Sequence, residues 1–64
     1  MKRILVTFDL KHKQAVRAYL VSNRVQYSMT TDIYMGDVHV YVPYSKGVRF
    51  LAELRRLSVP YRLV

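Results

Sequence analysis

The central third of the chain, from Arg24 to Pro43, alternates between apolar and polar residues with a period of two. This period is typical of strands in a sheet that has one buried face and one solvated face. Gly36-Asp37 interrupts the alternation, and glycine at the first central position is typical of a type II′ turn. The stretch therefore predicts a β-hairpin with a two-residue loop, in which Tyr34 pairs with His39.

This pairing divides the predicted hairpin into two faces with different chemistry. The apolar face, which we expect to pack on the core, consists of Thr31, Ile33, Met35, Val38, Val40 and Val42. The opposite face is polar and aromatic, and consists of Asp32, Tyr34, His39 and Tyr41. We expect functional residues on the second face, because it presents rings and polar groups to solvent.

The segments on either side of the hairpin complete the predicted set of elements. Alternation predicts a first strand, and the spacing of apolar residues by three and four predicts two helices. Asp9 and Ser45 are candidate N-caps, Asn23 is a candidate terminator, and Pro60 favours an edge position for the last strand. The predicted ranges are a strand over Arg3–Phe8, a helix over Lys11–Asn23, a helix over Lys46–Leu57 and a strand over Val59–Val64.

The resulting order is strand, helix, strand, strand, helix, strand. This order predicts an α+β fold of the ferredoxin-like β-α-β-β-α-β type, a single domain over residues 1–64. Two helices would cover one face of a four-stranded antiparallel sheet, with the first and third strands in the middle. The other face would be open.

Charge changes the picture more than the rest of the composition does. Eleven Lys and Arg stand against four Asp and Glu, so the net charge is +7. A basic domain favours polyanions, which points to nucleic acid first and to an acidic protein surface second. We expect a cytoplasmic protein without a membrane segment. A chain of 64 residues buries little surface by itself, so a homodimer would also be reasonable.

The open face and the helix edges supply the candidate binding residues, which are Arg3, Lys11, Lys13, Arg17, Arg24, Tyr34, His39, Tyr41 and Arg62. Rings flanked by cations suit single-stranded nucleic acid or RNA, because bases stack on rings and phosphates bind cations. The placement of His39 and Tyr41 resembles the aromatic pair on the third strand of RNA-recognition-motif domains. The same face could instead be an interface with a protein or with a second copy, for example in a phage-encoded inhibitor of a host enzyme.

A further resemblance covers the first half of the chain. Val6-Thr7-Phe8-Asp9 followed by Arg24-Val25-Gln26-Tyr27-Ser28 resembles the small ferredoxin-like subunit of the CRISPR spacer-integration complex and its toxin relatives. The resemblance implies that Asp9 binds a divalent metal in a nuclease. The alternative is that Asp9 only caps a helix.

Other catalytic chemistry has little basis in this sequence. The chain has no cysteine, two histidines far apart and four carboxylates, and it lacks a glycine-rich phosphate loop. We therefore expect a non-enzyme with no cofactor and no metal site.

Overall fold

Strands and helices alternate along the chain in the computed structural model, which describes residues 2–63. Within this range the elements are β1 (Arg3–Asp9), the short 3₁₀ helix η1 (Leu10–His12), α1 (Lys13–Ser22), β2 (Ser28–Asp32), β3 (Asp37–Pro43), α2 (Tyr44–Arg56) and β4 (Tyr61–Leu63). The fold is thus α+β, as predicted.

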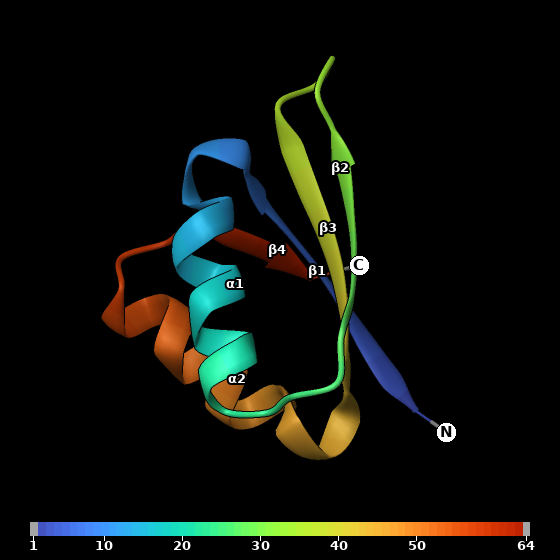
Figure 1. The fold of residues 1–64 in the computed structure, drawn as a ribbon, viewed down its shortest axis with the longest axis vertical. Coiled ribbons are helices and arrows are strands. Elements are labelled where there is room, and N and C mark those ends of the chain that lie inside the picture. The colour runs from blue at the N-terminus through green and yellow to red at the C-terminus, as the bar shows by residue number, and fades with distance from the viewer. Residues whose placement is uncertain (1, 64) are drawn as a thin grey trace.

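The four strands form one antiparallel sheet in the order β2-β3-β1-β4. The first and third strands are central, as predicted, and β4 lies at an edge, as Pro60 indicated. Both helices lie on the same side of the sheet (Figure 1). The opposite side is left open.

The core lies between the helices and the sheet. Its fully buried side chains come from β1, β3 and the inner stripes of both helices: Val6, Val16, Leu20, Val38, Val40, Val42, Phe50 and Leu54. Tyr19 of α1 stacks on Phe50 of α2 with ring centroids 6.2 Å apart. Burial of each large apolar side chain contributes roughly 1.5–3 kcal/mol, so this contact layer holds the helices on the sheet.

The hairpin register differs from the predicted one. Thr30, and not Tyr34, pairs with His39, and Asp32 pairs with Asp37. Residues 33–36 therefore form a four-residue loop, in which Gly36 has a φ of +71°. Asp32 causes this change, because its Oδ1 accepts hydrogen bonds from the backbone N–H groups of Tyr34 and Met35, both at 3.1 Å. These two residues are thereby drawn out of the strand.

The shift in register is four residues, and this even number preserves the predicted faces of the paired residues. Val38, Val40 and Val42 are fully buried, whereas Tyr41 is 40% exposed. The prediction is wrong for the loop. Ile33 and Met35 were expected in the core but are 71% and 72% exposed.

The boundaries of the first helix also differ from the prediction. Asp9 is an N-cap, as predicted, but it caps η1, where its Oδ1 accepts from the backbone N–H of Lys11 at 2.9 Å. Arg24, with a φ of 53°, takes the left-handed conformation that was expected at Asn23. The segment 24–27 is a loop, because β2 begins only at Ser28.

The second half of the chain needs smaller corrections. Pro43 is the N-cap of α2, whereas Ser45 lies inside the helix and makes no cap bond there. Gly47 permits close packing of α2 on β1, since a Cβ there would lie 2.9 Å from Cδ1 of Ile4. Val59 is a buried core residue before β4 and not part of it, and Val64 lies outside the described residues.

No helix in the range 2–63 is both long and apolar enough to cross a membrane.

Candidate functional site

The middle of the open face is organised around Thr7 on β1. His39 of β3 lies opposite Thr7 on one side, and Arg62 of β4 lies opposite it on the other. The Thr7 hydroxyl and Nδ1 of His39 form a hydrogen bond of 3.0 Å. Thr7 is only 3% exposed, although both helices lie on the other side of the sheet. The hydrogen bond holds the imidazole of His39 against the sheet.

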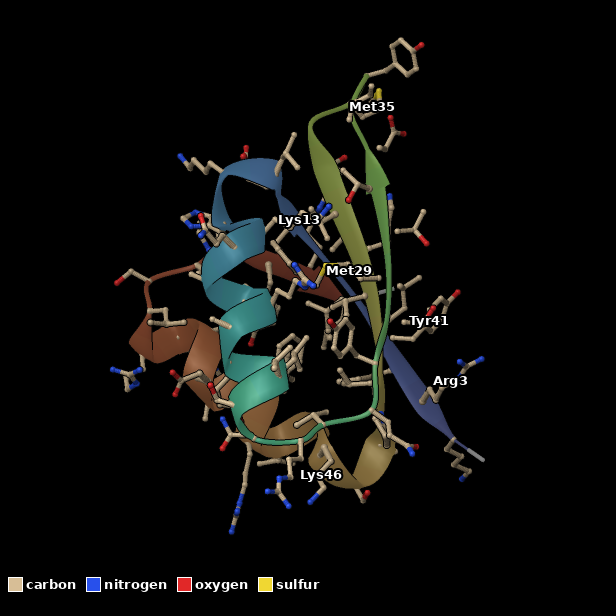
Figure 2. The ribbon with its side chains drawn as sticks, viewed as in Figure 1. Arg3, Lys13, Met29, Met35, Tyr41 and Lys46 are labelled. Carbon is tan, nitrogen blue, oxygen red and sulfur yellow. The ribbon has the colours of Figure 1, made fainter. Side chains whose placement is uncertain are left out.

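One end of the open face combines a cation with an aromatic ring. The guanidinium carbon of Arg3 lies 4.9 Å from the centroid of the Tyr41 ring, which is a cation–π distance. Figure 2 shows both side chains on the side of the sheet away from the helices. They border a shallow concavity, here called the sheet hollow, which is lined by Arg3, Gln26, Tyr27, Ser28, Tyr41 and Pro43. Polar, aromatic and cationic groups therefore meet at this end.

The opposite end of the open face is acidic. Asp37 pairs with Asp9 on one side and with Asp32 on the other, so three carboxylates follow one another across three strands. Their side chains have local partners. Asp9 and Asp32 accept backbone N–H groups, and Oδ2 of Asp37 lies 3.7 Å from Nη2 of Arg62. No three His, Cys, Asp or Glu side chains in the described range are grouped so that they could hold a metal.

A second cationic surface lies where α1 passes the edge strand β2. Lys13 and Arg17 project from α1 at i and i+4, and therefore lie on the same helix face. They line a concavity together with two residues near the start of β2. This helix-edge hollow is lined by Lys13, Arg17, Tyr27 and Met29. Tyr27 lines both this hollow and the sheet hollow, so the two concavities meet at that residue.

The structure brings only some of the predicted binding residues together. Arg3 and Tyr41 are in contact, His39 and Arg62 flank Thr7, and Lys13 and Arg17 share a hollow. Lys11 of η1 lines a further hollow on α1 together with Lys13 and Arg17. The remaining two are separate, because Arg24 lies in the loop after α1 and Tyr34 is 95% exposed in the hairpin loop. The prediction that Tyr34 belongs to the open sheet face is therefore wrong.

Gln26, Tyr27 and Ser28 contribute to the sheet hollow, although the sequence did not identify them as binding residues. Tyr27 falls in the apolar series of the alternating segment Arg24–Pro43, which predicts a core-facing side chain, and it does pack partly on the core. However, the chain at Tyr27 is still a loop, so its ring also reaches the surface. The only sequence signal was a polar residue on each side of an aromatic one.

In comparisons with known proteins, no family model, curated protein or solved structure matches the chain. The two resemblances drawn from the sequence therefore stay predictions.

Proposed function

We propose that this protein binds single-stranded nucleic acid, with the sheet hollow as its principal contact. The observation that carries the proposal is the Arg3–Tyr41 pair on a face that no helix covers. The Tyr41 ring and the Arg3 guanidinium, whose carbon lies 4.9 Å from the ring centroid, are both flat groups on which a base can stack. The guanidinium also provides a positive charge for a phosphate. Ser28 and Gln26 add hydrogen-bonding groups at the rim of the same hollow.

Charge supports one route for the bound strand. The acidic row formed by Asp9, Asp37 and Asp32 repels phosphates from the far end of the face. The opposite end continues through Tyr27 into the helix-edge hollow, where Lys13 and Arg17 are the cations. A strand that stacks near Tyr41 would therefore leave across the start of β2 towards α1. It would not follow β3 to the loop.

Unpaired bases fit this surface better than a duplex does. Base stacking on an exposed ring requires a base that is free of its own stack, as in single strands and loops. Each such contact contributes roughly 1–3 kcal/mol and tolerates any base. We therefore propose binding with low sequence preference, to single-stranded DNA or to unpaired RNA.

Titration of the protein into labelled oligonucleotides tests the proposal. Single-stranded and duplex forms of one sequence would be compared by fluorescence anisotropy at two salt concentrations. Four phosphate contacts would weaken single-strand binding roughly 50-fold for a fourfold rise in salt. We expect that loss together with a preference for the single strand. Equal affinity for the duplex would contradict the stacking role, and no binding at low salt would contradict the function.

A second candidate function is docking on another protein. The observation that favours it is the exposure of Ile33, Tyr34 and Met35 in the hairpin loop, since contiguous exposed apolar side chains mark interaction surfaces. Capture from a lysate before and after nuclease treatment separates the two functions. A partner that survives nuclease treatment supports docking, and one that is lost supports nucleic-acid binding.

We also infer that the fold is of the ferredoxin-like type. The order of elements and the central positions of β1 and β3 support this assignment. The assignment concerns architecture alone, since one fold hosts many functions.

A further inference from the structure

The loop of the β2–β3 hairpin presents three consecutive apolar side chains to solvent, here called the hairpin tip: Ile33, Tyr34 and Met35. Their exposed fractions are 71%, 95% and 72%. Figure 2 shows Met35 at the extreme end of the hairpin, far from the Arg3–Tyr41 pair. A run of this kind is unusual on the surface of a small basic protein, and it is typical of a contact with another macromolecule.

The backbone of the hairpin tip is held in place from two directions. Asp32 accepts the N–H groups of Tyr34 and Met35 through its side chain, and the N–H of Gly36 through its carbonyl oxygen at 2.9 Å. The carbonyl of Gly36 in turn accepts the N–H of Leu10 at 2.8 Å. A loop fixed in this way loses little conformational entropy when it binds, so the tip is preorganised for docking.

The outer surface of α1 carries a concavity that matches the tip in chemistry. This α1 hollow is lined by Leu10, Lys11, Lys13, Gln14, Arg17, Ala18 and Val21. Its aliphatic lining consists of Leu10, Ala18 and Val21, and Val21 is 58% exposed. Three cations, Lys11, Lys13 and Arg17, line the same hollow. The hollow therefore suits an apolar insert that carries negative charge at its base.

The hairpin tip has that charge pattern. Asp32 and Asp37 pair directly below it, where β2 and β3 meet the loop. Negative carboxylates at the base of the tip complement Lys11, Lys13 and Arg17 around the hollow. They also disfavour a phosphate-bearing partner, whether nucleic acid or an anionic lipid surface.

We propose that the hairpin tip of one copy of this chain inserts into the α1 hollow of a second copy, and that the two copies exchange tips. A two-fold dimer makes each contact twice, once in each direction. Leu10 makes this arrangement feasible, because it lines the hollow and also bonds to Gly36 in the loop. Tip and hollow are therefore neighbours within each copy. The sheet hollow stays outside the interface, whereas Lys13 and Arg17 line both the α1 hollow and the helix-edge hollow, so a bound strand and the inserted tip would share these two cations.

Sedimentation equilibrium of the purified chain tests the dimer. We expect the wild-type mass to rise with concentration from one chain to two. The tip variant Y34S/M35S and the hollow variant V21D should each stay monomeric where the wild type is dimeric. V48D is the matched control, because Val48 is 81% exposed on α2 outside both surfaces and should leave the dimer intact. Circular dichroism spectra would verify that all variants fold.

A mixture of the two defective variants tests the exchange itself. The V21D chain keeps an intact tip, and the Y34S/M35S chain keeps an intact hollow. One of the two contacts can therefore re-form between them. At the highest concentration, the average molar mass of the mixture should exceed the mean of the values measured for the separate variants. A mixture at that mean would contradict the exchange. A wild type that stays monomeric to millimolar concentration, or a dimer that survives either variant, would overturn the proposal.

Discussion

Tyr41 and Tyr34 are the same residue type in opposite situations. Tyr41 lies on β3, with one face of its ring near the Arg3 guanidinium, and is 40% exposed. Tyr34 is 95% exposed in the hairpin loop, beside the acidic end of the sheet. The sequence placed both rings on one face, and the structure separates them. Substituting each tyrosine in turn therefore tests whether binding depends on the ring in the sheet hollow or on any exposed aromatic ring.

Tyr41→Leu should weaken binding of a single-stranded oligonucleotide, because leucine keeps the bulk but removes the ring on which a base stacks. Loss of one stack of roughly 1–3 kcal/mol corresponds to a decrease in affinity of about 5- to 150-fold. Tyr34→Leu is the matched control and should leave the affinity unchanged. Anisotropy titrations of both variants measure the difference. Equal losses, or none at Tyr41, would contradict the assigned role.

Gly36→Ala should lower the free energy of unfolding by about 1 kcal/mol. Nothing lies within 4 Å of a Cβ at this position, so the cost comes from the φ of +71° and not from a clash. Gly36→Asn should cost less, since asparagine tolerates the left-handed region better than alanine does. Urea unfolding of the three chains gives these values. An alanine variant as stable as the wild type would contradict the described loop conformation.

At the scale of elements, the sequence gives the strands and helices but not the residues at which the hairpin turns. Ile33 and Met35 continue the odd-numbered apolar series of β2, so periodicity alone extends the strand to the glycine. The turn depends on Asp32, whose carboxylate binds two backbone N–H groups that the strand would otherwise use. The sequence signal for this turn was Asp32, an aspartate that can bind backbone N–H groups, four residues before Gly36. The apolar series through Ile33 and Met35 was a stronger signal, and it favoured a strand.

The faces of the sheet could be predicted in spite of this error, for a physical reason. Side chains alternate every residue, so a register shift of four leaves every paired residue on its predicted side. The sheet hollow could be predicted only in part. Arg3 and Tyr41 follow from alternation, whereas Gln26 and Tyr27 belong to a loop, and their position depends on how α1 packs and ends.

Helix α2 provides a pH-dependent contact away from the candidate site. The sequence spacing favours Arg49 as the partner of Glu53, but the structure pairs Glu53 with Arg56, whose Nε donates to Oε1 at 3.0 Å. This hydrogen bond, followed by the charge of Arg56, lowers the pKa of Glu53, while partial burial opposes the shift. The carboxylate is thus favoured in the folded state.

The pKa of Glu53 should consequently rise in Arg56→Gln, because glutamine removes the charge and the bidentate donor. A carboxyl group with a pKa that is lowered on folding stabilises the protein above its unfolded pKa. That contribution is lost as the pH falls through the folded pKa. NMR titration of the Glu53 side chain in both chains measures the shift. Identical titration midpoints would contradict the Glu53–Arg56 pair.

In the whole molecule, the acidic residues are clustered and the basic ones are dispersed. The chain has eleven basic residues and four acidic ones. Three of the four acidic residues are the aspartates that form a single row at the loop end of the sheet. Cations line the sheet hollow (Arg3), the helix-edge hollow (Lys13, Arg17) and the α1 hollow (Lys11, Lys13, Arg17). The net positive charge attracts a polyanion to the molecule, and the aspartate row disfavours phosphates at the loop end of the open face.

Chemical-shift mapping during titration with a short unlabelled single-stranded oligonucleotide locates the contact in the wild-type protein. We predict that backbone amide shifts change most at Arg3, Ser28 and Tyr41, with smaller changes at Lys13 and Arg17. The amides of residues 33–36 and of α2 should stay in place. Changes confined to the hairpin loop or to α2, with those of Tyr41 unmoved at saturation, would contradict this prediction.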